Sequence, residues 1–485
     1  MSTIKSEVAS GLVWKFGERI LAQGVSFVLS LVLARLLMPE EYGTVALVMV
    51  FINLANVFIT SGLGDSLIQK KDADEKDFST MFYCSMAMSI VLYIIMFISA
   101  PLIANFYDNP SLTSIIRVLS IQIPLGGVKT IQHAYVIKRM MFKKFFFSTL
   151  GGTLFSGVVG IVLAYHGAGV WAIVVQYLTN STIDMIVLFI TVNWRPHAYF
   201  DLKVAKELFS YGWKLTVAQF LNTAYGNIRN LFIGKLYTES ELAFYNKGDQ
   251  FPNLIINNIN NSINTVLFPA MAQENENKQR LKRITRRAMK LSAYLIFPIM
   301  VGLIAVSEPL IRILLTDKWL PCVPYLCISC VYWMFQPCQT ANVQVIKALG
   351  RSDLYLKLEV AKKVFGIVIL LASLKFGVLA IALSNVILAV FSAILNIFPN
   401  KELINYGYRE QIRDLLPALL LSIVMGAIVK LEEQLHLNDL LLIIVQGCTG
   451  VFVYVALSAI THNESYDYLL NFVKEKFGKK KTNHA

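Results

Sequence analysis

The chain alternates long apolar stretches with short polar segments along almost its whole length. A helix needs about 20 residues to cross the roughly 30 Å of bilayer hydrocarbon. Apolar stretches of this order lie at 11–37, 42–69, 78–100, 112–137, 145–165, 169–192, 213–236, 242–270, 288–307, 323–348, 357–375, 378–398, 414–432 and 439–461. The pattern predicts an all-α polytopic membrane protein of about fourteen transmembrane helices. The first stretch is too long for the apolar part of a secretory signal, so we expect a retained span.

Composition agrees with a membrane protein. Of the 485 residues, 56% are hydrophobic and 15% are charged. Soluble domains usually carry about 25% charged residues. A soluble chain of this length could not cover so much apolar surface, so the excess requires the bilayer as solvent.

Basic residues are concentrated in alternate connecting segments. The basic segments contain Lys70, Lys71 and Lys76; Lys138, Arg139, Lys143 and Lys144; Arg195, Lys203 and Lys206; the run 278–287; Arg351; Lys401, Arg409 and Arg413; and the lysines of the tail, 474–481. The segments between them contain only two basic residues, Arg312 and Lys318. Because basic loops stay in the cytoplasm, this alternation predicts cytoplasmic termini and an even number of spans. The net charge of +13 therefore reflects topology and contact with anionic lipid, and we expect no nucleic acid partner.

Two stretches of sequence resemble each other across the middle of the chain. Trp14-Lys15 opens one span and Trp213-Lys214 another, and each span closes with a cation and a short acidic turn, at 35–41 and 235–241. Six spans separate the two, so the halves enter the membrane in the same orientation, as in the parallel repeats of transporters. We therefore expect an N-lobe over 1–205, a C-lobe over 206–400, and two extra spans with a basic cytoplasmic tail over 401–485.

Polar side chains form a stripe on the first span. Lys15, Arg19, Gln23, Ser26 and Ser30 recur at helical spacing, which places them on one face. A charge at the bilayer centre costs roughly 2.5–3.5 kcal/mol on insertion scales, so such a face should line a wet cavity. Glu18 lies one turn from Lys15, and we expect it to neutralise part of that charge.

The repeat-related span and its successor carry similar stripes. Members of these stripes are Gln219, Asn222 and Arg229 on the first, and Asn257, Asn260, Asn261 and Asn264 on the second. Amides at this spacing can hydrogen-bond sugar hydroxyls along a transport path, or they can hydrogen-bond one helix to another. The sequence leaves both interpretations open. Asp65 and Asp184 are further intramembrane acids, which either pair with a cation or couple transport to an ion.

The surplus of cations favours an anionic substrate. Arginine binds phosphate through two parallel hydrogen bonds and lysine binds it as a point charge. We therefore expect Lys15, Arg19 and Arg229 to contact a diphosphate headgroup, with Gln23 and the amide stripes along the rest of the path. Cys327 and Cys330 have the spacing of a metal or redox pair, but no second pair or histidine stands at zinc spacing, so we expect neither metal nor cofactor.

Several motifs resemble the polysaccharide transporter branch of the multidrug/oligosaccharidyl-lipid/polysaccharide (MOP) exporter superfamily. They are Ser10-Gly11-Leu12-Val13-Trp14, Ala34-Arg35-Leu36-Leu37-Met38-Pro39-Glu40-Glu41-Tyr42-Gly43, Tyr245-Asn246-Lys247-Gly248-Asp249-Gln250-Phe251-Pro252, Leu267-Phe268-Pro269-Ala270-Met271 and Ile346-Lys347-Ala348-Leu349-Gly350-Arg351-Ser352-Asp353. The nearest type is the Wzx-like flippase, including colanic-acid and teichuronic-acid exporters.

The resemblance implies two six-helix lobes plus two helices, the MOP/MATE-like fold, and alternating access in the bacterial cytoplasmic membrane. It implies an undecaprenyl-diphosphate-linked oligosaccharide as cargo, for O-antigen, capsule or exopolysaccharide synthesis. A polysaccharide polymerase and chain-length proteins are the protein partners it implies. The coupling force stays open between protons, sodium and the membrane potential alone.

Three other functions compete with a flippase. A drug/cation antiporter of the same superfamily predicts acids in the cavity, whereas cations outnumber acids in the spans at 11–37 and 213–236. A membrane polymerase or glycosyltransferase generally needs a large outer loop with catalytic groups, and the longest outer segment here is 308–322. A major-facilitator carrier is disfavoured by the span count.

Overall fold

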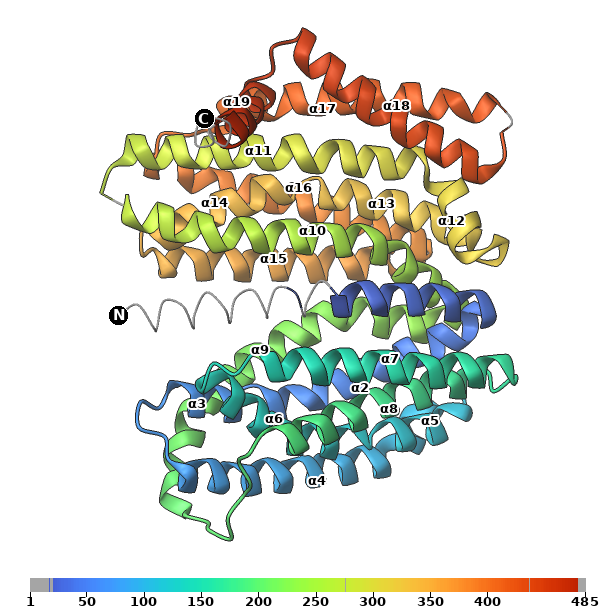
Figure 1. Cartoon of the computed structure of the whole chain (residues 1–485), viewed down its shortest axis with the longest axis vertical. Helices are drawn as coiled ribbons and strands as arrows, with labels where there is room; N and C mark the ends of the chain where they lie inside the picture. Colours follow the sequence, from blue (N-terminus) through green and yellow to red (C-terminus); the bar gives the residue numbers. More distant parts are fainter. Residues whose placement is uncertain (1–16, 18–20, 275, 436, 479–485) are drawn as a thin grey trace, which may run out of the picture. The chain divides into compact units, whose positions relative to one another are not determined.

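All regular structure in the described part of the chain is helical (Figure 1). The computed structural model describes residues 17, 21–274, 276–435 and 437–478. A short apolar helix, Leu21–Leu36, comes first. It is followed by α2 (Pro39–Thr60), α3 (Leu63–Gln69), α4 (Glu75–Phe106), α5 (Ser111–Leu119), α6 (Gln122–Lys138), α7 (Lys143–Tyr165), α8 (Val170–Thr191) and α9 (Leu202–Leu236).

The second half of the chain has the same character. Its elements are α10 (Glu239–Gln273), α11 (Lys278–Ala305), α12 (Ser307–Leu315), η1 (Asp317–Cys322), α13 (Val323–Trp333), α14 (Gln336–Ala348), α15 (Ser352–Ser373), η2 (Leu374–Phe376), α16 (Val378–Leu403), α17 (Tyr408–Leu431), η3 (Glu432–Leu435), α18 (Asp439–Ile460) and α19 (Glu464–Gly478).

Within the described residues, nine helical segments are long and apolar enough to cross a bilayer. They are Pro39–Gln69, Glu75–Phe106, Ser111–Lys138, Lys143–Tyr165, Val170–Thr191, Lys278–Ala305, Val378–Leu403, Tyr408–Leu435 and Asp439–Ile460. The other predicted spans coincide with helices that are shorter or more polar, namely Leu21–Leu36, α9, α10, α13 with α14, and α15. The total of fourteen therefore stays a prediction.

The surface is apolar where a soluble protein would be polar. Leu102 on α4 is 70% exposed and Phe452 on α18 is 73% exposed, and both stand among other exposed aliphatic residues. An apolar surface of this extent needs a hydrocarbon solvent. The continuous helices satisfy the backbone hydrogen bonds that lipid could not satisfy. The protein is therefore a multi-pass membrane protein.

The acidic turn that the sequence repeats is a helix start in both halves. At α2 the Met38 amide donates to Glu41 Oε2 at 2.7 Å, and at α10 the Thr238 amide donates to Glu241 Oε2 at 3.3 Å. Each glutamate thus satisfies an amide that the first helical turn leaves unpaired. The repeat is therefore a shared local structure as well as a sequence pattern.

Residue contacts divide the chain into two compact units, Met1–Ala243 and Phe244–Ala485. The dividing point lies one helix later than 205/206, because α9 packs against α2, α3 and α4. Thr216 Oγ1 on α9 donates to the Ser61 carbonyl oxygen at 2.6 Å. A Cβ on Gly212 would lie 2.6 Å from the carbonyl oxygen of Gly62, so glycine is needed for this approach. Thus α9 starts the second half of the repeat but packs with the first unit.

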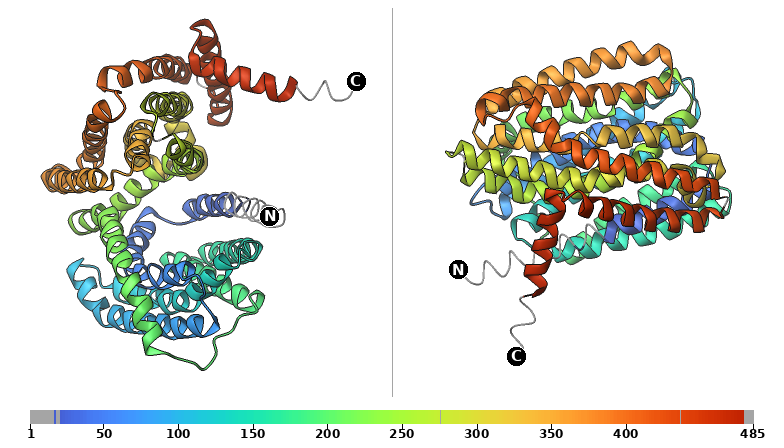
Figure 2. Two further views of the ribbon diagram at one scale, coloured as in Figure 1. Left: turned by 90° about the vertical axis from the view of Figure 1, so that its left-hand side faces the viewer. Right: turned by 90° about the horizontal axis from the view of Figure 1, so that it is seen from above.

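The last three helices extend the second unit. Helix α17 packs along α11, and α18 packs on α17 and α12. Figure 2 shows α19 running across the direction of α11, α17 and α18 instead of alongside them. An amphipathic helix in this orientation, just after the final apolar helix, fits the surface of a bilayer.

Candidate functional site

The predicted cavity residues of the first span are described in part. Lys15, Glu18 and Arg19 lie outside the described residues. Gln23 follows them on the same stripe and is half-buried on helix Leu21–Leu36. The predicted diphosphate contact of Lys15 and Arg19 stays a prediction.

Arg229 on α9 is the buried cation of the candidate site. Its side chain is 8% exposed, and its Nε and Nη2 atoms are buried without a hydrogen-bond partner among the described residues. A guanidinium that loses water without gaining acceptors costs several kcal/mol. Arg229 can therefore accept an anionic ligand at little further desolvation cost. Toward the N-terminal end of the same helix, Gln219 and Asn222 are exposed polar side chains.

The structure divides the amide stripe on α10 into two kinds of residue. Asn260 Oδ1 accepts from Thr340 Oγ1 at 3.4 Å, and Asn264 Oδ1 accepts from Gln344 Nε2 at 2.9 Å, so these two amides bond α10 to α14. Asn257 and Asn261 are exposed instead. Half of the stripe therefore joins helices, and half is accessible to a ligand.

A directed chain of hydrogen bonds leads along α10 to Asn257. Trp333 Nε1 donates to Asp249 Oδ1 at 2.9 Å, and Asn253 Nδ2 donates to Asp249 Oδ2 at 3.0 Å. Asn257 Nδ2 in turn donates to Asn253 Oδ1. Because a carboxylate accepts only, Asp249 sets the direction of the whole chain. Asn257 is left with its amide oxygen as an acceptor for a ligand hydroxyl.

Asp184 and Lys129 form an ion pair within the apolar spans of the first unit. Lys129 Nζ on α6 lies 2.9 Å from Asp184 Oδ2 on α8, and His133 Nε2 lies 4.0 Å from the same oxygen. Asp184 Oδ1 is buried and has no hydrogen bond among the described residues. Asp65, the other acid singled out in the sequence, is exposed near the end of its span and forms no ion pair with any described residue. The structure therefore joins Asp184, and not Asp65, to an intramembrane cation.

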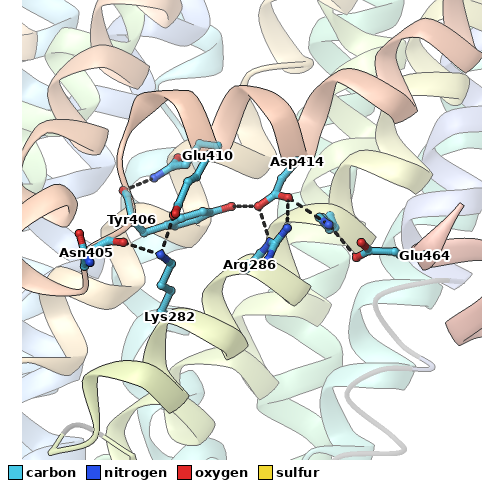
Figure 3. Close-up of polar contacts among 9 residues, drawn as sticks. Lys282, Arg286, Asn405, Tyr406, Glu410, Asp414 and Glu464 are labelled. Atoms are coloured by element: carbon cyan, nitrogen blue, oxygen red, sulfur yellow. Dashed lines mark hydrogen bonds and ion pairs between the residues drawn. The ribbon is translucent and has the colours of Figure 1, made fainter.

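A network of charges joins α11, α17 and α19 at one end of the second unit (Figure 3). Asp414 accepts from Arg286 Nε at 2.6 Å, from Tyr406 Oη at 2.8 Å and from Lys290 Nζ at 3.0 Å. Lys290 also lies 2.7 Å from Glu464 on α19. Burial, together with the hydrogen bond to Asp414, raises the pKa of the Tyr406 phenol above its ordinary value.

The interpretation of the sequence did not predict this network. It assigned the basic run of α11 to topology and lipid contact, and it gave Asp414 no role. A signal was present, because Asp414 is an acid at the start of an apolar span and an unpaired acid there is costly. Its cationic partners, Arg286 and Lys290, lie more than 100 residues away in sequence, so spacing could not identify them.

The described part of the chain shows neither a bonded cysteine pair nor a cluster of metal-binding side chains. Cys330 is buried and Cys327 is half-buried, and both are free thiols. No group of three or more His, Cys, Asp or Glu side chains is arranged to hold a metal ion among the described residues.

A family model described as "polysaccharide biosynthesis protein" matches residues 32–324, which is more than half of the chain. The chain belongs to this family. Curated relatives agree. The chain is 24% identical to the lipopolysaccharide biosynthesis protein WzxC of Escherichia coli over 88% of its length and 89% of the relative's. It is 25% identical to the teichuronic acid biosynthesis protein TuaB of Bacillus subtilis, with 73% and 74% covered. It is 21% identical to the succinoglycan biosynthesis transport protein ExoT of Rhizobium meliloti, with 71% and 70% covered.

Solved structures show the fold. The lipid II flippase MurJ matches 94% of this chain and 99% of its own, with a TM-score of 0.74 at 18% identity. An inward-facing multidrug resistance MATE family transporter of the MOP superfamily matches 80% and 99%, with a TM-score of 0.60 at 13% identity. The predicted all-α polytopic, MOP/MATE-like fold is therefore confirmed, as is the resemblance to the polysaccharide transporters.

Proposed function

We propose that this protein moves undecaprenyl-diphosphate-linked oligosaccharide repeat units from the cytoplasmic to the outer leaflet by alternating access. It acts as a transporter and catalyses no covalent step. The observation that carries the proposal is Arg229, a buried guanidinium with two nitrogens that find no acceptor among the described residues. Membership of the polysaccharide biosynthesis family supports it.

The chemistry of such a cargo matches two kinds of side chain, one in each unit. A diphosphate supplies the acceptor oxygens that Arg229 lacks, and charge-assisted bonds of this kind are about twice as strong as neutral ones. Sugar hydroxyls can donate to the amide oxygens of exposed side chains such as Asn257 and Asn261. Arg229 belongs to the first unit, and Asn257 and Asn261 belong to the second.

The charge pattern and the relatives support the proposed location and partners. The basic residues alternate between connecting segments, which supports cytoplasmic termini in the bacterial inner membrane. Relatives act in teichuronic acid, lipopolysaccharide and succinoglycan biosynthesis. We therefore extend the proposal to surface polysaccharide synthesis, with a polymerase and chain-length proteins as partners.

A drug/cation antiporter would share this fold but fits the pairing of Asp184 and Asp414 less well. Asp184 is paired with Lys129, and Asp414 is paired with Arg286 and Lys290. A cationic drug would have to compete with these bound cations. The segment at 308–322, where an enzyme would need catalytic groups, forms the short helices α12 and η1, and its Arg312 pairs with Glu308 and Asp317.

Arg229→Gln tests the proposal in a flippase-null strain. Loss of a charge-assisted bond of about 1.5–3 kcal/mol should lower surface-polymer output roughly 10-fold or more at matched protein levels. Arg229→Lys should restore part of the output, because it keeps the charge. The matched control is Lys235→Gln, which removes one cation from the same helix, where Lys235 pairs with Asp108 at 2.7 Å. Normal output from Arg229→Gln would remove Arg229 from the transport path and with it the main support for the proposal.

A further inference from the structure

A small cavity with four cations lies between α11 and α19. It has a volume of about 270 Å³. Its lining consists of Arg283, Arg286, Arg287, Lys290, Leu291, Glu464, Ser465 and Tyr468. We call it the α11–α19 cavity. The transport proposal gives it no role.

Two of the four cations are already neutralised. Asp414 binds Arg286 and Lys290, and Glu464 is the second partner of Lys290. Arg283 and Arg287 pair with no carboxylate among the described residues. The guanidinium of Arg287 instead lies 4.4 Å from the centre of the Tyr468 ring. The four cations carry four positive charges, and their two carboxylate partners carry two negative ones. The α11–α19 cavity therefore keeps a net charge of +2.

An apolar groove begins where the cavity ends. It has a volume of about 500 Å³ and shares Lys290, Glu464 and Ser465 with the cavity. Its remaining walls come from α17 and α18 and the turn after α18, as Asp414, Pro417, Ala418, Leu420, Leu421, Val424, Leu457, Thr461, His462 and Asn463. Leu420 and Val424 are 52% and 46% exposed. The groove is therefore open at the apolar surface of the unit, where acyl chains lie.

A polar cavity continuous with an apolar groove matches the two ends of one lipid molecule. The cations stand on the basic end of α11, which the charge pattern assigns to the cytoplasmic side. Basic pockets between transmembrane helices on that side suit lipid headgroups. Helix α19 crosses the direction of the other helices (Figure 2). Its Tyr468 lines the cavity. The cavity could therefore hold a lipid headgroup, and the groove could hold one of its acyl chains.

We propose that this is a binding site for an anionic glycerophospholipid of the inner leaflet. Its phosphate contacts Arg283 and Arg287, and one acyl chain lies in the α17–α18 groove. Because the groove is open at the apolar surface, a lipid of the surrounding bilayer can enter it. The positive charge of the cavity favours an anionic one. The bound lipid joins α11, α17 and α19 and is a structural ligand, separate from the transported cargo.

The test is lipid binding by the full-length purified protein in detergent, measured by native mass spectrometry with dioleoylphosphatidylglycerol and dioleoylphosphatidylcholine. The wild type should bind phosphatidylglycerol about 30-fold more tightly than phosphatidylcholine, as expected for two surface cations facing one anionic lipid. Equal binding of the two lipids would overturn the proposal without any variant.

A pair of double variants tests the residues. Arg283→Gln with Arg287→Gln should remove most of the preference for phosphatidylglycerol. Lys278→Gln with Arg280→Gln removes the same charge from the same helix outside the cavity lining and should leave the preference intact. An equal loss in both double variants would reduce the effect to general surface charge and contradict the proposal. Displacement of phosphatidylglycerol by a tenfold lower concentration of undecaprenyl phosphate would assign the cavity to the carrier lipid and contradict it as well.

Discussion

At the scale of single residues, the sequence predicts the depth of Arg229 in its span but not the partners of the amides on α10. The position of Arg229 within a polar stripe predicts a cavity-facing cation. The structure shows a buried side chain whose Nε and Nη2 atoms have no hydrogen-bond partner among the described residues. The amide stripe on α10 was different. Spacing placed Asn257, Asn260 and Asn264 near one face, but it could not give the facing residues Thr340 and Gln344. Whether an amide bonds a helix or a ligand depends on those partners.

Asp249 offers a prediction at the same scale. Asp249→Asn removes the group that accepts only, so Asn253 and Asn257 lose their fixed orientation. We expect cargo transport to fall about 5- to 10-fold, the effect of roughly one hydrogen bond. Asn258→Ala is the matched control, because Asn258 donates to the Leu254 carbonyl oxygen of its own helix. Transport rates in vesicles measure both variants, and an equal loss in the two would contradict an orienting role for Asp249.

At the scale of helices, the apolar pattern predicts most elements. Each span must satisfy its own backbone hydrogen bonds in hydrocarbon, so each long apolar run forms a helix. Breaks within spans are less visible. The predicted span at 323–348 is two helices, α13 and α14, and Pro337 lies at the start of the second. Proline lacks the amide that a continuous helix would need, which explains the break. The pairing of α9 with the first unit depends on the approach of Gly62 and Gly212, which no periodicity reports.

Gly212→Ala should therefore weaken the docking of α9. The new Cβ would meet backbone atoms of Gly62 at 2.6 to 3.0 Å, and Gly62 has a φ of +94°, so the backbone must shift. Overpacking of this kind costs typically about 1–3 kcal/mol. Gly226→Ala on the same helix meets nothing within 4 Å and should be neutral or slightly stabilising. Thermal unfolding in detergent compares them, and identical melting temperatures would contradict a glycine-dependent contact.

At the scale of the whole molecule, the sequence predicts the class of the protein, and its predicted boundary at 205/206 stays a prediction. The apolar runs and the alternating basic segments are long-range statistical signals, and they identify a polytopic membrane protein. The MOP/MATE-like fold is what the resemblance of its motifs implies. The division into units depends on which helix packs on which neighbour. Helix α9 follows the repeat in sequence but packs on α2 and α3, so the units divide between Ala243 and Phe244.

The most direct test of the account is transport by the purified protein in sealed vesicles. A fluorescent oligosaccharide on undecaprenyl diphosphate is loaded, and the fraction reached by a membrane-impermeant glycosidase is followed over time under an imposed ion gradient or membrane potential. We expect vesicles with wild-type protein to expose additional substrate to the glycosidase, and vesicles with Arg229→Gln to expose it at least about 10-fold more slowly. Movement of a cationic dye by the same vesicles, with the oligosaccharide lipid left in its original leaflet, would contradict the account.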